Sequence, residues 1–171
     1  MDCREFTTGF GTVKVMGKSA TMRVLSELVG KESVLEDERS IALTGGSTPK
    51  AFYSWLNERK QDKQHQSLKN LVWTVSDERC VPLTDIESNF GNADRGFLRS
   101  FRISENQKIY WRTELEPNLA ATRFEAIWTK RFGTDVCFDL CFLGMGDDCH
   151  TASIFPGSIL LEKESKTRFS A

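Results

Sequence analysis

Asp148 and His150 are the residues whose types and spacing best suit chemistry in this chain. They follow an apolar run, 140–143, that predicts a buried strand, and Gly144 and Gly146 interrupt the chain at the carboxyl end of that run. Open α/β sheets bind ligands beyond the carboxyl ends of their strands. A neutral imidazole accepts a proton from water, and a nearby carboxylate fixes its tautomer. The pair therefore indicates general-base chemistry, although a surface histidine in an ordinary strand-to-helix turn shows the same pattern.

A glycine-rich turn is a second candidate, because it follows another apolar run, 41–44, and precedes Pro49. Glycine lets the backbone approach an anion closely, and the free N–H groups that begin a helix donate to it. A phosphate group would fit at the four residues of this turn, which are Gly45, Gly46, Ser47 and Thr48. The turn lacks the pattern of a Walker loop and of a dinucleotide-binding loop. A tight turn that uses glycine for geometry alone explains it equally well.

A charged triplet, Asp77-Glu78-Arg79, leaves a third apolar run, 71–75. Arg79 could bind a phosphate or carboxylate in a bidentate manner. Further along, Ser88 or Asn89 is expected to cap a helix. Taken alone, the triplet is also typical of a solvated loop.

Cysteine offers two alternative chemistries near His150. A zinc set of Cys137, Cys141, Cys149 and His150 is conceivable, but the chain contains no C-x-x-C pair. A Cys149 nucleophile is disfavoured, because adjacent residues in an extended turn point apart and no third orienting group is evident. The second histidine, His65, lies in a polar stretch and is expected to be inert.

Alternating strands and helices must position these residues. Apolar strand patterns cover 12–16, 41–44, 71–75, 109–111 and 140–143. Helices with one apolar face are expected to begin near Ser19, Pro49, Ser88 and Asn118, the first ending at Gly30. This alternation predicts a single α/β domain over residues 1–171, with an open, mainly parallel sheet and helices on both faces.

Composition narrows the class of protein. The 171 residues are 39% hydrophobic and 27% charged, and the net charge is −1. These values are typical of a soluble globular domain and give no indication of a nucleic-acid or membrane partner. The first ten residues lack the apolar segment of a signal peptide. Five cysteines without framework spacing favour a reducing compartment, so we expect a cytoplasmic protein.

Three segments together resemble the 6-phosphogluconolactonases: residues 44–49, residues 76–82 with Ser88 and Asn89, and residues 143–157. The third segment is the most specific. Related amino-sugar-phosphate deaminases usually have Asp-Glu-Tyr in place of the triplet that ends at Arg79. They also end the last motif in Asn-Glu-Pro, where this chain has Ile154-Phe155-Pro156. Both differences favour the lactonases.

The resemblance implies hydrolysis of 6-phosphoglucono-δ-lactone to 6-phosphogluconate, in the oxidative pentose phosphate pathway, without a metal or organic cofactor. His150 would be the general base on water, and Asp148 would orient it. The implied substrate-binding residues are Gly45, Gly46, Ser47, Thr48, Arg79, Ser88, Asn89, Gly144 and Gly146. Two alternatives are a catalytically silent sugar-phosphate-binding domain of the same fold and an amino-sugar-phosphate isomerase or deaminase.

Two departures from the family pattern bear on this interpretation. Cys149 stands where the family usually has glycine, and a side chain there costs about 1–2 kcal/mol if the backbone needs a positive φ. The chain also stops at Ala171. We therefore expect it to lack the strand-and-helix segment with which family members continue and which supplies a basic residue to the substrate. The sequence does not predict an oligomeric state.

Overall fold

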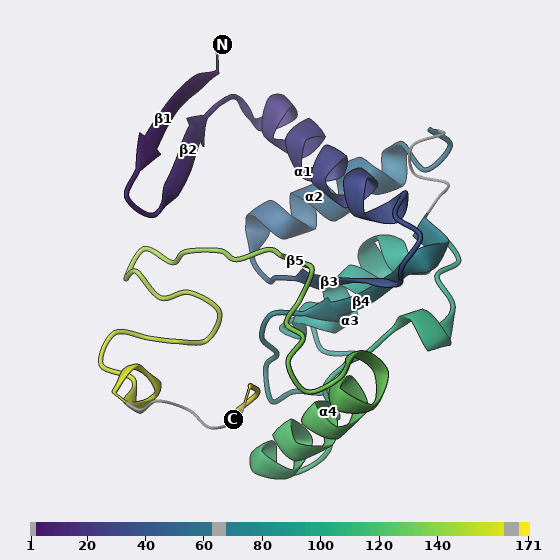
Figure 1. The fold of residues 1–171 in the computed structure, drawn as a ribbon, viewed down its shortest axis with the longest axis vertical. Helices are drawn as coiled ribbons and strands as arrows, with labels where there is room; N and C mark the ends of the chain where they lie inside the picture. The colour runs from purple at the N-terminus through teal and green to yellow at the C-terminus, as the bar shows by residue number, and fades with distance from the viewer. Residues whose placement is uncertain (1–2, 63–67, 163–167) are drawn as a thin grey trace.

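A parallel sheet forms the centre of the molecule (Figure 1). The computed structural model describes residues 3–62, 68–162 and 168–171. Strands β3 (Arg39–Leu43), β4 (Leu71–Val75) and β5 (Leu140–Cys141) pair in the order β4-β3-β5. Because the three strands run in parallel, their carboxyl ends meet at one edge of the sheet. That edge is where the candidate residues were expected.

Helices cover both faces of this sheet, as the sequence predicts. They are α1 (Lys18–Ser33), α2 (Ser47–Glu58), α3 (Asn89–Ala93), which continues as a π-helical turn over Asp94–Leu98, and α4 (Pro117–Phe132). Side chains of successive strand residues point to opposite faces. Trp73 therefore packs in one core cluster with residues of α1, α2 and the π-helical turn, while Val72 packs in a second cluster against α4. This arrangement confirms the predicted α/β class.

Aromatic side chains fill both clusters. On the first face, the ring of Phe97 contacts Trp73 edge-on with the ring centroids 5.2 Å apart, and the centroid of Tyr53 lies 5.3 Å from that of Phe97. On the second face, Phe124 and Trp128 of α4 stack with their centroids 6.2 Å apart. Such pairs add about 0.5–1.5 kcal/mol beyond the area that they bury. The candidate edge therefore follows strands whose two faces are packed against aromatic side chains.

The prediction of a buried strand over 140–143 was wrong. β5 has only two residues, Cys141 is exposed, and Leu143 is 59% exposed. The cause is position in the sheet, because β5 pairs with β3 on one side and lies at the sheet edge in the described structure. A strand was also expected over 109–111, but those residues form no strand and only Lys108 bridges to Trp73.

The amino-terminal region forms a separate hairpin of β1 (Arg4–Thr8) and β2 (Gly11–Val15). The sequence predicted a strand at 12–16 and missed its partner. Helix α1 runs through Gly30 to Ser33, so that glycine does not end it. His65 lies outside the described residues. Within the described residues, every helix is too short or too polar to cross a membrane.

Candidate functional site

The glycine turn connects β3 to α2 at the predicted edge. Gly46 has φ of +107°, in the region that favours glycine. Gly45 is required for a different reason, because a Cβ there would lie 2.0 Å from Oδ1 of Asn89. No side chain among the described residues caps α2. The first N–H groups of this helix therefore offer donors at the positive end of its dipole.

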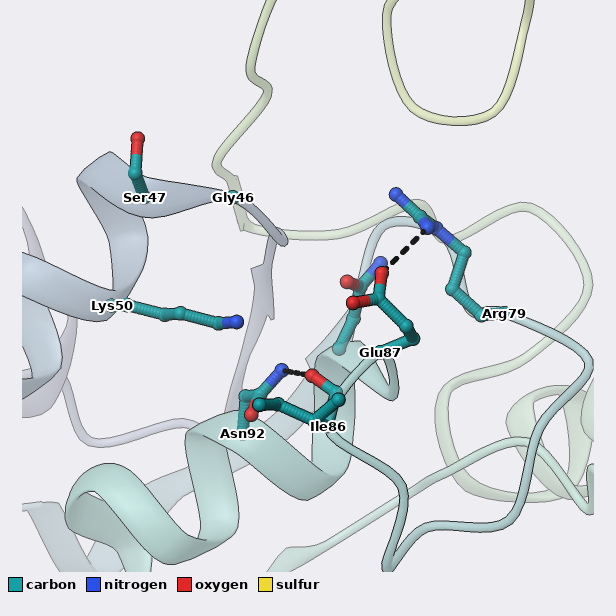
Figure 2. Close-up of a pocket in the computed structure, with 8 residues that line it drawn as sticks. Gly46, Ser47, Lys50, Arg79, Ile86, Glu87 and Asn92 are labelled. Carbon is teal, nitrogen blue, oxygen red and sulfur yellow. Dashed lines mark hydrogen bonds and ion pairs between the residues drawn. The ribbon is translucent and has the colours of Figure 1, made fainter.

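A cavity of about 200 Å³ opens beside this turn (Figure 2). Eight of the described residues line it: Gly46, Ser47, Lys50, Arg79, Ile86, Glu87, Asn89 and Asn92. Lys50 extends from the first turn of α2 toward Glu87 and Asn92, and Arg79 lies on the opposite side. Gly45 and Thr48 were predicted as residues of the phosphate site together with Gly46 and Ser47, but neither is part of this lining. Two cations and a helix N-terminus make the cavity suited to an anion.

Lys50 is the positively charged residue of the lining that the sequence analysis missed, and Ile86, Glu87 and Asn92 were also not predicted. A weak signal was present, because Lys50 stands three residues after Ser47 and therefore falls on the same helical turn as the glycine-rich loop. Lys50 is an exposed residue and is not part of the core. A lysine in this place is a mobile point charge, whereas Arg79 can bind in a planar, bidentate manner.

Glu78 and Arg79 of the charged triplet make different contacts. The Glu78 carboxylate accepts hydrogen bonds from the backbone N–H of Asn89 at 2.7 Å and of Phe90 at 2.9 Å. It thereby binds the amides that begin α3. Arg79 remains at the cavity, where its Nη1 lies 3.4 Å from Oε2 of Glu87. Glu78 is therefore not part of a solvated loop, because it is half-buried and holds the start of α3, and a binding role for Arg79 stays a prediction.

Ser88 and Asn89 fix the start of α3. Ser88 is completely buried, and its Oγ accepts from the N–H of Gly91 at 2.9 Å and donates to Glu78 at 3.1 Å, so the predicted helix cap is confirmed. Asn89 is 4% exposed and donates through Nδ2 to the carbonyl of Asp77 at 2.9 Å. Asn89 also lines the cavity, whereas the hydroxyl of Ser88 is occupied inside the protein.

The predicted catalytic pair is formed. Nδ1 of His150 lies 2.5 Å from Oδ1 of Asp148. This hydrogen bond is the main reason that the pKa of Asp148 is lowered. A carboxylate at Nδ1 favours the tautomer with its proton there, which leaves Nε2 free to accept a proton. Gly146 makes room for the ring, because a Cβ at that position would lie 2.3 Å from Nδ1 of His150.

Backbone hydrogen bonds hold this turn in shape. The N–H of Gly146 donates to the carbonyl of His150, and the N–H of Cys149 donates to that of Gly146, both at 2.9 Å. The amide of Gly146, a residue that the resemblance placed in the substrate site, is thus committed within the turn. Thr151 Oγ1 donates to the carbonyl of Gly144 at 2.9 Å. Cys149 has φ of +68°, so the condition for backbone strain at this departure from the family pattern is met.

One side-chain bond joins the histidine turn to the cavity frame. Ser153 Oγ donates to Oδ2 of Asp77 at 2.6 Å, and the carbonyl of Asp77 holds Asn89, which lines the cavity. The glycine turn, the triplet and the histidine turn therefore meet at one sheet edge. His150 itself lies outside the set of described residues that line the cavity. Among the described residues, no cluster of His, Cys, Asp and Glu is arranged to hold a metal ion.

Comparisons with known proteins agree on one family. Residues 16–171 match the model of the family described as glucosamine-6-phosphate isomerases/6-phosphogluconolactonase. The chain is 40% identical over 126 residues to the 6-phosphogluconolactonase of Treponema pallidum, covering 71% of this chain and 51% of that protein. It is 36% identical over 125 residues to the Haemophilus influenzae enzyme, covering 73% of this chain and 53% of that one. The chain thus spans about half the length of these relatives.

Solved structures show the same fold. The crystal structure of 6-phosphogluconolactonase from Thermotoga maritima has a TM-score of 0.71 at 28% identity, covering 95% of this chain and 66% of that one. A structure described as devB protein has a TM-score of 0.76 at 33% identity, covering 83% and 60%. A monomeric glucosamine-6-phosphate deaminase, at 15% identity and a TM-score of 0.67, covers 81% and 56% and shares the fold alone.

Proposed function

Because this chain belongs to the glucosamine-6-phosphate isomerase/6-phosphogluconolactonase family, we propose that its site hydrolyses 6-phosphoglucono-δ-lactone to 6-phosphogluconate. The cavity beside α2 would hold the 6-phosphate. Lys50 and Arg79 supply positive charge there, and the amides at the start of α2 supply N–H donors. Ser88 is proposed as a positioning residue, because its hydroxyl is occupied in the cap of α3.

The proposed reaction uses a water molecule and the imidazole of His150. Nε2 accepts a proton as the water oxygen attacks the lactone carbonyl carbon, and Asp148 stabilises the imidazolium that forms. The tetrahedral intermediate then collapses by breaking the bond from that carbon to the ring oxygen. The imidazolium returns its proton to this oxygen as it leaves, and the carboxylic acid product ionises. A lactone is an activated ester, so positioning the water supplies much of the rate enhancement.

A single observation carries this proposal: the phosphate-type cavity and the histidine turn share one edge of the sheet, joined through the bond from Ser153 to Asp77. A single sugar phosphate can reach two sites only if they lie at the same edge. Ser76 separates Asp77 from the end of β4, and the carboxylate of Asp77 also accepts from Ser76 Oγ at 3.0 Å. This carboxylate therefore fixes the histidine turn relative to the strand that leads to Arg79.

Lactone hydrolysis by the purified chain tests the proposal, with the spontaneous rate subtracted. His150→Ala should lower kcat by about 100-fold or more, because general-base catalysis contributes roughly 10²–10⁴. Arg79→Gln should act mainly on KM, because it removes a phosphate contact and leaves the imidazole in place. A chain that hydrolyses the lactone no faster than its His150→Ala variant would contradict the catalytic role.

A sugar-phosphate-binding domain without turnover is the second candidate. The observation that favours it is that His150 lies outside the described lining of the cavity, so phosphate binding does not by itself require the imidazole. Thermal stabilisation by 6-phosphogluconate together with absence of turnover would establish this candidate. A cytoplasmic location belongs to the same proposal, and the five cysteines, all free and exposed in the structure, support a reducing compartment.

A further inference from the structure

Glu87 is an acidic residue inside a cavity otherwise suited to anions. Its Oε2 lies 3.4 Å from Nη1 of Arg79, and both residues line the cavity (Figure 2). The other charged residue of the lining is Lys50, so the cavity carries two positive charges and one negative charge. The Glu87 carboxylate therefore contacts a guanidinium nitrogen that could otherwise donate to a phosphate oxygen.

Glu87 differs in this respect from Glu78, the other carboxylate close to Arg79. Glu78 binds the amides of Asn89 and Phe90 and is committed to α3. The backbone of Glu87 is also fixed, because its N–H donates to Oδ1 of Asp85 at 2.8 Å. Its side chain is 63% exposed, however, and that of Arg79 is 50% exposed. The carboxylate can therefore turn into solvent while the loop keeps its shape.

We infer that Glu87 competes with the bound phosphate group for Arg79 and so sets the affinity of the cavity for anions. This inference rests on the proposed function, in which the cavity binds a sugar phosphate. Without a bound ligand, the Glu87 carboxylate pairs with the guanidinium of Arg79 and weakens the binding of simple anions to it. A phosphate that also engages Lys50 and the N-terminal amides of α2 displaces the carboxylate, which makes Glu87 a specificity-determining residue.

Binding of inorganic phosphate to the full chain, measured by calorimetry, tests this inference. Glu87→Gln should tighten phosphate binding by roughly two- to fivefold, which corresponds to the loss of one exposed ion pair. Glu5→Gln is the matched control, because it makes the same change of charge in the hairpin, at an exposed glutamate paired with Lys14. That control should leave the phosphate Kd unchanged.

Repeating the measurement in an Arg79→Gln background separates competition from general repulsion. If the carboxylate acts through Arg79, Glu87→Gln should change the phosphate Kd by less than about 1.5-fold once the guanidinium is removed. An equal gain in both backgrounds would overturn the competition. A second result would also overturn it: Arg79→Gln weakens phosphate binding, but Glu87→Gln leaves the phosphate Kd unchanged. In that case the phosphate site itself would still be supported. Failure of every variant and of the wild type to bind phosphate would overturn this inference, and absence of lactone hydrolysis as well would overturn the proposed function with it.

Discussion

At the scale of single residues, the bond between Asp148 and His150 is the feature most directly open to measurement. The hydrogen bond from the imidazole lowers the pKa of Asp148 below its ordinary value of 3.8. Because the pKa of Asp148 is lowered in the folded protein, the stabilisation from this hydrogen bond is fully present at pH values above the ordinary pKa. It is lost as the pH falls through the lowered pKa. Asp148 therefore stays ionised across the range in which a lactonase would work.

Removing the imidazole should return the pKa of Asp148 toward 3.8. Carboxyl-carbon NMR titration of the wild type and of His150→Ala measures this shift without any assay of activity. Asp147 is the internal control, because it lies beside Asp148 and has no hydrogen bond to the ring in the structure described here. An unchanged midpoint for Asp148 in the variant would show that the pair does not form in solution.

Gly146 should be more sensitive to substitution than Gly144, although both belong to the same turn. A Cβ on Gly146 would lie 2.3 Å from Nδ1 of His150 and 2.8 Å from Oδ1 of Asp148, whereas a Cβ on Gly144 meets no described atom within 4 Å. Gly146→Ala should therefore displace the ring and lower kcat by about 10-fold or more, since a misplacement near 1 Å can cost 10²-fold. Gly144→Ala, with its backbone intact, should stay close to the wild-type rate. Equal effects of the two substitutions would contradict this view of the turn.

At the scale of elements, α3 depends on a carboxylate from another loop. Glu78 accepts from two backbone N–H groups of α3 and from Ser88 Oγ. Glu78→Gln should lower the free energy of unfolding by about 1–2 kcal/mol, because charge-assisted bonds to amides that begin a helix are lost. Urea unfolding measures the change. Glu58→Gln is the control, because Glu58 is exposed near the end of α2 and pairs there with its neighbour Arg59.

Pattern reasoning predicted elements well where a residue's role depends on its own strand or helix. The order of β3, α2, β4, α3 and α4 and the cap at Ser88 are local features, whereas the pairing of Asp148 with His150 came from the resemblance to the lactonases. It failed where the outcome depends on distant partners. The exposure of Leu143 follows from the edge position of β5, and the role of Glu78 follows from an α3 terminus some ten residues away. Neither relation is visible as a period or motif.

At the scale of the whole molecule, the two ends of the chain make very different contacts. Every residue of β1 and β2 is exposed, and the pair Phe6–Val13 lies on a face that the rest of the described chain leaves open. In Figure 1 the hairpin projects away from the sheet. Near the other end, Phe169 lies 4.7 Å from the ring of Phe124, and Arg168 binds Glu125 on α4. The carboxyl-terminal residues therefore contribute to the second core cluster, and the hairpin does not.

This contrast predicts opposite responses to two changes. Deleting residues 1–15, which leaves Gly17 to precede α1, should change the free energy of unfolding by less than about 0.5 kcal/mol, because every residue of β1 and β2 is exposed in the structure. Phe169→Ala should cost about 1–2 kcal/mol, because it removes a half-buried ring from the aromatic cluster of α4. Urea unfolding followed by tryptophan fluorescence measures both, since Trp128 lies in that cluster. An isolated two-stranded hairpin is at best marginally stable in water and contributes little to the free energy of unfolding by itself. If deletion lowers that free energy by more than about 1 kcal/mol, the apolar face of the hairpin must pack against the rest of the molecule in solution.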